Sequence, residues 1–165
     1  MPDKIISAFV YEGRVKEMIH QYKFEDAYLL AESFSEGLIP IVKKIEGYKK
    51  YKATYIPLSK QRERYRGYNQ SKLLADKVAY RLNMKVLDLL ERKGQGETQV
   101  TAKTKVARKR NIRGVFSLQE GVKVPDKLIL FDDVVTTGAT VEEAVRVLKK
   151  AGAKKVMVVA LAMGS

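Results

Sequence analysis

The stretch LILFDDVVTTGAT, residues 128–140, decides the fold of this chain. Its first four residues are all apolar, and an apolar run without alternation is typical of a strand buried on both faces of a parallel sheet. The pattern TVEEAVRVLKKAGA, which begins at Thr140, predicts a helix that ends near Gly152, because glycine suits the left-handed cap of a helix. A buried strand that leads directly into a helix indicates an α/β protein.

Strand and helix patterns alternate over the rest of the chain. ATYIPLS, from Ala53, predicts a strand, and GYNQSKLLADKVAYRLN predicts the helix after it, with apolar residues at helical spacing at positions 73, 74, 78 and 82. KVLDLLER and KKVMVVALA predict two further strands. IISAFVY and the helical stretch from Glu25 to about Ile45 are less easily placed, and they fit an edge strand with covering helices. The sequence therefore predicts the α/β class, with an open parallel sheet flanked by helices.

The composition favours a single globular domain over residues 1–165. Of the 165 residues, 45% are hydrophobic, and no stretch rich in Gly, Ser or Pro divides the chain. No window approaches the roughly 18 consecutive apolar residues of a membrane span, and the N-terminus lacks a signal-peptide pattern, so we expect no membrane partner and a cytoplasmic location. The chain has no cysteine and one histidine, His20, which leaves only a hard, oxygen-bound metal plausible and favours a structural role for His20.

The net charge of +13 indicates an anionic partner: nucleic acid, an acidic membrane surface or a small anion. The positions of the basic residues along the sequence discriminate between these partners better than the net charge does. Seven basic residues and one acid lie within residues 49–66, and eight basic residues and one acid lie within residues 92–113. Nearly half of the positive charge therefore falls in two stretches, and neither is a terminal tail.

Two adjacent carboxylates, Asp132 and Asp133, end the apolar run. In open α/β sheets ligands bind outside the carboxyl ends of the strands, so this pair is placed to meet a ligand. The following loop and the positive end of the helix dipole converge on one spot, which suits a phosphate. Gly138 allows close backbone approach or a positive φ. Hydroxyl donors to phosphate oxygens come from Thr136, Thr137 and Thr140.

Both halves of this motif together suit a ribose 5-phosphate, because carboxylates accept hydrogen bonds from ribose hydroxyls while the loop donates to the phosphate. The alternative is that the two aspartates only begin a turn and Thr140 only caps a helix. The complete order of apolar strand, acidic pair, hydroxyl-rich glycine loop and amphipathic helix favours the ligand interpretation.

At these residues the sequence resembles a known family. LILFDDVVTTGAT resembles the phosphoribosyl pyrophosphate signature of type I phosphoribosyltransferases. IPLSKQRERYRGYNQSKLLADKVA, ETQVTAKTKVARKRNIRGVFSL and that signature, in this order, resemble the competence-protein ComF family, with a looser likeness in AFVYEGRVKEMIHQYKFEDAYLLA. Members of that family usually begin with a four-cysteine zinc ribbon, and this sequence has no cysteine.

The resemblance assigns roles to individual residues. It implies that Asp132 and Asp133 hold the ribose hydroxyls, directly or through Mg²⁺. It implies that residues 53–165 are the core and residues 1–52 a hood or covering region. Five residues would cradle the 5-phosphate, namely Thr136, Thr137, Gly138, Ala139 and Thr140, and four would form the pyrophosphate loop, namely Pro57, Leu58, Ser59 and Lys60.

The basic residues after that loop fit the same ligand. Arg62, Arg64 and Arg66 stand at alternate positions and could send guanidiniums to a pyrophosphate, although a solvated, irregular basic turn is the alternative. The second basic stretch predicts a mobile loop leading into a short helix around Ala107. By resemblance this loop closes over the site. Thr98, Gln99, Arg108, Asn111 and Gly114 stand where the family motif has them, while RKRNIR alone also suits a nucleic-acid arm.

The resemblance implies a phosphoribosyltransferase that binds phosphoribosyl pyrophosphate with Mg²⁺, or a nucleoside monophosphate, and transfers the phosphoribosyl group to or from an unidentified base or amine. Phe9, Tyr11, Tyr22 and Phe24 could stack a base, but aromatics at such spacings are more often core. Two alternatives stay open: a non-catalytic sensor of the same ligand, and a nucleic-acid-binding component linked to DNA uptake. Weak nonspecific binding of nucleic acid is expected from the charge, and a homodimer is left open.

Overall fold

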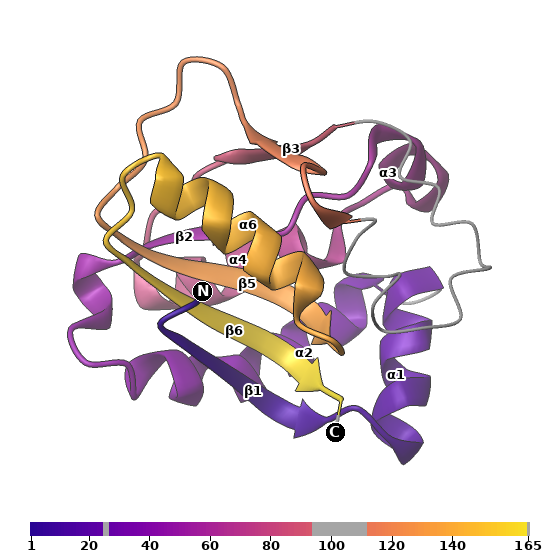
Figure 1. Ribbon diagram of the computed structural model, residues 1–165. Coiled ribbons are helices and arrows are strands. Elements are labelled where there is room, and N and C mark those ends of the chain that lie inside the picture. The colour runs from indigo at the N-terminus through magenta and orange to yellow at the C-terminus, as the bar shows by residue number, and fades with distance from the viewer. Residues whose placement is uncertain (25–26, 94–111, 165) are drawn as a thin grey trace.

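The computed structural model describes residues 1–24, 27–93 and 112–164. Its main sheet has four parallel strands, and the expectation of an open parallel sheet is confirmed (Figure 1). The strands are β1 (Lys4–Val10), β2 (Lys52–Tyr55), β5 (Lys127–Val135) and β6 (Lys155–Met163), in the spatial order β1-β6-β5-β2. The apolar run of the opening motif is thus in β5, an inner strand that pairs with β2 on one side and β6 on the other.

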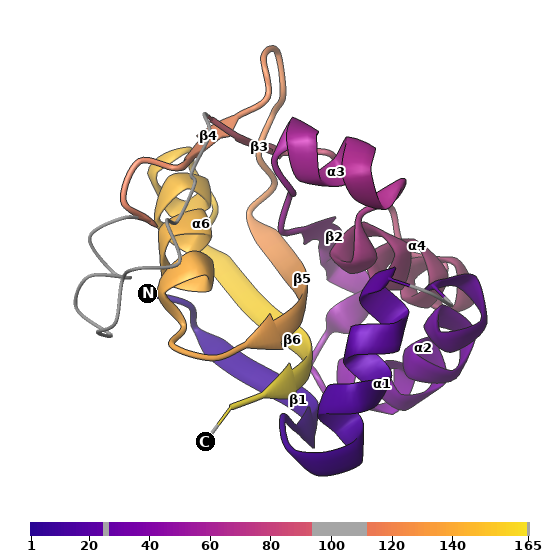
Figure 2. The ribbon, with the colours of Figure 1, turned by 90° about the vertical axis from the view of Figure 1, so that its right-hand side faces the viewer.

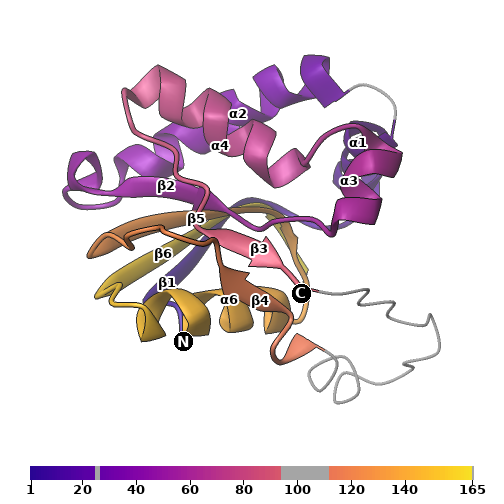
Figure 3. The ribbon, with the colours of Figure 1, turned by 90° about the horizontal axis from the view of Figure 1, so that it is seen from above.

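Helices cover both faces of the sheet, as a parallel sheet requires. Figure 3 shows α6 (Ala139–Lys150) on one face and α2 (Ala27–Lys43) with α4 (Gln70–Leu82) on the other. Side chains of β5 alternate between the two: Leu128 and Leu130 pack in the cluster under α6, whereas Ile129 and Phe131 pack in the cluster under the other helices. The sheet is therefore buried on both sides.

The covering helices follow from their apolar spacing. In α6 the buried residues Val141, Ala144, Val145 and Leu148 recur at three and four positions, which places them on one face of the helix. α4 begins where Asn69 accepts a hydrogen bond from the backbone N–H of Lys72 (3.1 Å). α1 (Gly13–Phe24) lies on the same side of the sheet as α2 and α4. In Figure 2, α1 stands at the carboxyl end of the strands.

The predicted strand KVLDLLER does not join the parallel sheet as a regular strand. Within KVLDLLER, Val86 forms a single parallel bridge to Ala53, and the chain then leaves the main sheet. β3 (Leu90–Arg92) pairs antiparallel with β4 (Phe116–Leu118) in a separate two-stranded sheet. The pattern predicts a strand, of which Leu90–Arg92 forms, but an apolar run does not specify its partner.

The segment after β2 is also more regular than expected. Residues after Ser59 form the short helix α3 (Lys60–Arg66), which ends at Gly67 with a φ of 80°, and not the irregular basic turn that was the alternative interpretation. A 3-10 turn, Tyr48–Lys50, precedes β2. The proposed division at residue 52 stays a prediction; β1, from the first part, pairs with β6 inside the main sheet. Among the helices of the described residues, none is long and apolar enough to cross a membrane.

Candidate functional site

The acidic pair lies at the carboxyl end of β5, and both side chains are largely buried. Asp132 is 6% exposed and Asp133 is 9% exposed. The Asp132 Oδ1 atom accepts hydrogen bonds from Ser71 Oγ (3.1 Å) and from the backbone N–H of Asp133 (2.9 Å). The Asp133 Oδ1 atom accepts from the backbone N–H of Val134 (2.7 Å). The two carboxylates are therefore held at the sheet edge.

A cation from the N-terminal region reaches the same pair. Lys23 Nζ, from the end of α1, lies 2.9 Å from Asp133 Oδ2, and Gln70 Nε2 donates to that oxygen at 3.3 Å. The Oε1 atom of Gln70 is buried and has no hydrogen-bond partner among the described residues. A buried polar atom without a partner is costly, and this one belongs to a side chain that contacts the acidic pair.

Electrostatics favour a ligand that neutralises this pair. Burial raises the pKa of Asp132 well above its ordinary value, and the neighbouring charge of Asp133 raises it further. Burial, and then the charge of Asp133, also raise the pKa of Tyr22 in α1. The charged form of Asp132 is thus disfavoured, so a cation or hydroxyl donors at this position would stabilise it.

The hydroxyl-rich loop after β5 has the geometry of an anion site. Gly138 has a φ of 74°, in the left-handed region, and it stands at the N-terminus of α6. A small cavity of about 30 Å³ is lined by Asp132 and by the loop residues, namely Val134, Val135, Thr136, Thr137, Gly138, Thr140 and Val141. Ala139 is the first residue of α6 and is buried. The structure thus brings the five predicted phosphate-binding residues together beside Asp132.

The crossovers of the sheet reverse direction between β2 and β5. From β2 the chain passes through α4 and returns as an outer neighbour of β2 at Val86, whereas from β5 it passes through α6 to β6 on the inner side. Such a reversal opens a crevice at the carboxyl ends of the two strands, where ligands bind in open α/β sheets. The segment after β2 and the acidic pair lie at this point, and Ile56 N donates to Phe131 O at 3.0 Å between them.

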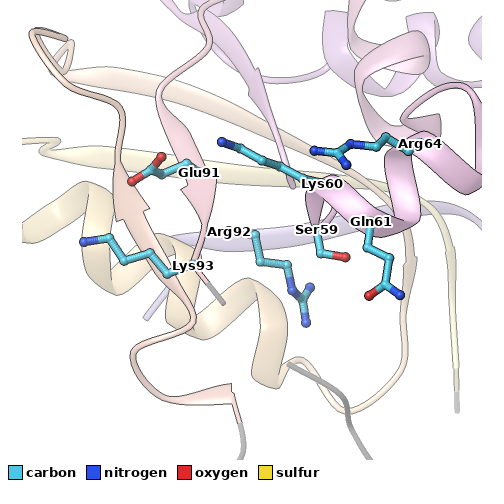
Figure 4. Close-up of a pocket in the computed structure, with 7 residues that line it drawn as sticks. All are labelled: Ser59, Lys60, Gln61, Arg64, Glu91, Arg92 and Lys93. Atoms are coloured by element: carbon cyan, nitrogen blue, oxygen red, sulfur yellow. The ribbon is translucent and has the colours of Figure 1, made fainter. Parts of the chain in front are cut away.

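A larger cavity, of about 600 Å³, lies on the β2 side of this point (Figure 4). Lys60 and Arg64 line it from α3, and Arg92 and Lys93 line it from β3 and the residue after it; in Figure 4 the side chain of Lys93 extends away from α3. Ser59, Gln61 and Glu91 complete its lining. Four basic residues and one acidic residue thus line one space, and the first basic stretch meets the start of the second.

The helical form of α3 corrects the expected arrangement of the arginines. Residues at alternate positions of a helix do not share a face, whereas residues four apart do. Lys60 and Arg64 accordingly line the cavity together, and Arg66 lies elsewhere, with its guanidinium carbon 4.9 Å from the centre of the Phe24 ring. Burial lowers the pKa of Arg66, and the charge of Asp133 opposes that shift. Arg66 therefore lies on the α1 side of the acidic pair.

The remaining predicted residues fall into two groups. Pro57 is buried and Leu58 half-buried between β2 and α3, next to Ser59, whose side chain accepts a hydrogen bond from Arg62 N at 3.3 Å. Four residues of the expected closing loop lie outside the described residues, as does the expected helix around Ala107; these are Thr98, Gln99, Arg108 and Asn111. Gly114 is described, and its N–H donates to Glu143 Oε1 at 2.7 Å.

The four aromatics of the N-terminal region differ in burial. Tyr22 is fully buried and packs edge-on against Phe34. Phe24 is 49% exposed beside His20, with 4.8 Å between their ring centres. Phe9 is 39% exposed, and Tyr11 is half-buried against the core. Tyr22 is therefore a core residue, and the ring of Phe24 is open to solvent near the acidic pair.

Several residues of this site were not singled out from the sequence: Lys23, Gln70, Ser71 and Arg92. The first signal available was the position of Gln70 and Ser71 at the start of a predicted helix, because helices that follow parallel strands begin at the carboxyl edge of the sheet. Arg92 was counted only as part of a basic stretch. Nothing in the spacing of the sequence links Lys23 to Asp133, which is 110 positions away.

Comparison with known proteins identifies the class. The model of the phosphoribosyl transferase domain matches residues 69–164, which include the acidic pair and the loop after it. Two solved structures also resemble this chain. TT1426 from Thermus thermophilus is 19% identical, with a TM-score of 0.45 over 84% of this chain and 74% of that one. Adenine phosphoribosyltransferase from Leishmania tarentolae is 13% identical, with a TM-score of 0.48 over 82% of this chain and 70% of that one.

Relatives of known name narrow the class to a family. Competence protein ComFC of Streptococcus pneumoniae is 34% identical over 90% of this chain and 63% of its own length. Competence protein ComFC of Bacillus subtilis is 28% identical over 88% and 58%, and the DNA utilization protein YhgH of Escherichia coli K12 is 29% identical over 94% and 70%. This chain belongs to the ComF family of type I phosphoribosyltransferase-like proteins. It spans about three fifths of the length of the two ComFC proteins.

Proposed function

We propose that this site binds phosphoribosyl pyrophosphate together with Mg²⁺ and transfers the phosphoribosyl group between pyrophosphate and a nitrogenous base or amine. The observation that carries the proposal is the position of Asp132 and Asp133. They lie where the crossovers reverse, with the hydroxyl-rich loop on the α6 side and the cation-lined cavity on the β2 side. Phosphoribosyl pyrophosphate has its groups in the same order: the 5-phosphate would face the loop, the ribose would face the acidic pair, and the 1-pyrophosphate would face the cavity.

Each part of the ligand has a matching part of the chain. Backbone N–H groups at the start of α6 and the threonine hydroxyls would donate to the 5-phosphate. Asp132, Asp133 and the unpartnered Gln70 Oε1 would accept from the ribose hydroxyls. The cations of the cavity would stabilise the negative charge that develops on the pyrophosphate as its bond to carbon 1 breaks and the bond to nitrogen forms. The positioning of these groups would supply most of the catalysis.

The residues present fit Mg²⁺ as an ion shared with the ligand. Within the described ranges no cluster of three or more His, Cys, Asp or Glu side chains could hold a metal alone. Mg²⁺ commonly binds through one or two carboxylates together with substrate phosphates, and Asp132 and Asp133 supply that number. When bound, the ion would neutralise charge on the pyrophosphate and the acidic pair. Lys23 already holds Asp133 Oδ2, so the ligand would have to share or displace that cation.

Calorimetry with phosphoribosyl pyrophosphate and Mg²⁺ tests the proposal. Replacing Asp132→Asn and Asp133→Asn together should weaken binding at least tenfold, about 1.4 kcal/mol, because the amides cannot replace the charge of the pair. Asp126→Asn is a matched control, since this exposed aspartate pairs with Lys154 near the amino end of β5. If the double variant binds as tightly as the parent, the acidic pair is only a turn and the proposal fails.

Two further assays address the two alternatives. Tight binding without release of pyrophosphate in the presence of any base would indicate a sensor. The relatives carry names that refer to competence and DNA utilization, so a role in DNA uptake or use is a second candidate for this chain. A thermal-shift screen with phosphoribosyl pyrophosphate, nucleoside monophosphates and short DNA separates a phosphoribosyl ligand from DNA, because a ligand of the native state raises its apparent stability, and the assay of pyrophosphate release separates the transferase from the sensor.

A further inference from the structure

The main sheet has one open edge within the described ranges, the outer side of β1. β1 is the lower edge strand in Figure 1, and it pairs with β6 alone. At the opposite edge, by contrast, Val86 continues the sheet beyond β2 through its bridge to Ala53. An open strand edge presents unpaired N–H and C=O groups, which can pair with a further strand. The outer side of β1 is therefore a template for the addition of a strand.

Backbone hydrogen bonds just before and just after β1 show which of its residues point outward. Asp3 N donates to Val156 O at 3.0 Å, and Tyr11 N donates to Met163 O at 2.8 Å. Neighbouring residues of a strand direct their backbone groups to opposite edges, so the odd-numbered residues of β1 face β6 and the even-numbered residues face outward. Within the part of the chain that the structure describes, the backbone groups of residues 4, 6 and 8 have no partner on that side.

β1 lacks the features that usually protect an edge strand, namely charges along the strand, proline or a bulge. Its sequence KIISAFV has one charge, at Lys4, and its register against β6 runs without a bulge to Val10. Phe9 and Val10 are 39% and 54% exposed, and Met163, which stands beside Val10 in β6, is 39% exposed. Apolar surface thus lies next to the unpaired backbone groups, so a second strand would bury both.

The free edge is complementary to a second copy of itself. In an antiparallel pair with a two-fold axis at Ser7, Ile6 of each copy lies opposite Ala8 of the other. Because residues 6 and 8 both face outward, each of these pairs exchanges two backbone hydrogen bonds. The small side chains of Ser7 and Ala8 at the centre allow the strands to approach. One strand thus supplies both halves of the ladder.

The charges favour the same arrangement. Lys4 would lie opposite Val10 of the second copy and diagonal to its Glu12, so the lysine stem covers an apolar side chain and the ammonium approaches a carboxylate. Neither Lys4 nor Glu12 forms an ion pair among the described residues. All four strands of the sheet begin with a lysine, namely Lys4, Lys52, Lys127 and Lys155. An antiparallel pair puts the lysine edges of the two copies at opposite ends of the joined sheet, which limits repulsion between chains of net charge +13.

We propose that two copies of this chain pair along β1, edge to edge and antiparallel, to form a dimer with one continuous sheet. Assembly closes at two copies, because each uses its open edge once. β6 separates β1 from β5, so the pairing leaves the acidic pair and its loop open. The interface is one strand edge with its flanking side chains, so association is reversible and depends on concentration.

Sedimentation velocity from micromolar to sub-millimolar concentration at physiological salt measures the association. Val10→Lys faces Lys4 of the other copy, and symmetry applies this like-charge contact twice, so the dissociation constant should rise at least about tenfold. Adding Lys4→Glu to Val10→Lys restores opposite charges and should recover most of the loss. Tyr80→Lys is the matched control, because this side chain is 86% exposed on α4 and adds the same charge away from β1; the constant should change less than about twofold.

Hydrogen exchange of single amides locates the interface. The amides of Ile6 and Ala8 should exchange rapidly in dilute protein and become protected as the concentration rises, whereas those of Ile5 and Ser7, which face β6, should be protected throughout. Thermal unfolding verifies that each variant is folded. A parent that stays monomeric would overturn the proposal. So would a dimer that Val10→Lys does not weaken, that Lys4→Glu does not rescue, or that leaves Ile6 and Ala8 unprotected, because it would form through another surface or register.

Discussion

Lys23→Met should destabilise the ligand-free protein, because it removes the cation that faces Asp133 Oδ2 at 2.9 Å. The side chains of the pair are 24% and 13% exposed, so the pair lies between a surface ion pair and a buried one. Exposed pairs contribute about 0 to 1 kcal/mol, and removing one partner of a buried pair costs about 3 to 5 kcal/mol. We expect a loss of about 2 kcal/mol in the free energy of unfolding. For a chain of this size that corresponds to a fall in Tm of about 4 to 8 °C.

The same variant should respond more strongly to the ligand. In the proposed function, phosphoribosyl pyrophosphate with Mg²⁺ would use the carboxylate that Lys23 contacts, so in the parent part of the binding free energy would be spent on displacing the ammonium. Differential scanning fluorimetry with and without the ligand measures both effects. The ligand-induced rise in Tm should be larger in Lys23→Met than in the parent, and the ligand-free Tm should be lower.

Lys77→Met is the appropriate control, since Lys77 pairs with Glu32 at 2.6 Å and the side chains are 29% and 54% exposed. This variant should change the free energy of unfolding by less than about 1 kcal/mol and leave the response to the ligand as in the parent. If Lys23→Met has an unchanged Tm and an unchanged response, the ammonium does not occupy the cation position of the acidic pair, and the argument from its geometry is refuted.

Three other predictions concern the loop, the acidic pair and the net charge. Gly138→Ala should lower the free energy of unfolding by about 1 to 2 kcal/mol and weaken the binding of ribose 5-phosphate, because a residue with a Cβ is strained at a φ of 74°. Space is not the reason, since the nearest atom to the added Cβ is an oxygen of Glu142 at 3.8 Å. Thermal unfolding and calorimetry measure the two effects, and an unchanged Tm would contradict the prediction. Because the pKa of Asp132 is raised on folding, the folded protein keeps a proton between pH 4 or so and the folded pKa that the unfolded chain has lost, about 4 being the ordinary value. The contribution of Asp132 to stability should therefore decline as the pH rises through this range. Asp132→Asn should remove that decline in a series of Tm values against pH, and parallel curves for variant and parent would argue against the prediction. Because of the net charge of +13, duplex DNA should bind weakly, with a dissociation constant of about 10⁻⁴ to 10⁻⁶ M at physiological salt. Phosphoribosyl pyrophosphate should compete with the DNA in an anisotropy assay. Nanomolar affinity for DNA that the ligand leaves unchanged would favour a separate nucleic-acid site.

The elements that the sequence predicted best are those with strong local signals. The apolar run of β5 predicts a strand that is buried on both faces, and the three- and four-residue spacing of α6 predicts a helix that is buried on one face. Both elements form as expected. The position of the proposed phosphate-binding loop was predictable for the same reason, since the loop connects these two elements. A functional motif between two strongly patterned elements is placed by them.

α3 was missed because it has no apolar stripe. KQRERYR buries none of its residues, so periodicity has nothing to detect. The available signals were the residues at its ends: Ser59 accepts a backbone hydrogen bond at the N-terminus, and Gly67 adopts a left-handed conformation at the C-terminus. Attention to these caps would have predicted the helix, and with it the shared face of Lys60 and Arg64.

The contacts between distant segments could not be predicted from local patterns. The ion pair of Lys23 with Asp133 joins α1 to β5, and the pairing of Arg92 with Phe116 joins β3 to a three-residue strand. Such pairs depend on how whole elements pack, which no spacing along the chain records. In this protein they supply Lys23 at the acidic pair and Arg92 in the lining of the larger cavity.

The base of the β3 and β4 hairpin has a consequence for protein engineering. Lys93 N donates to Val115 O at 2.8 Å, and the N–H of Gly114 donates to the buried carboxylate of Glu143 on α6. The two ends of residues 94–111 are thus fixed next to each other by contacts that do not involve those residues. The hairpin base is therefore a natural grafting point, at which segments of different length or charge can be exchanged while the parallel sheet and the start of α6 keep their own contacts.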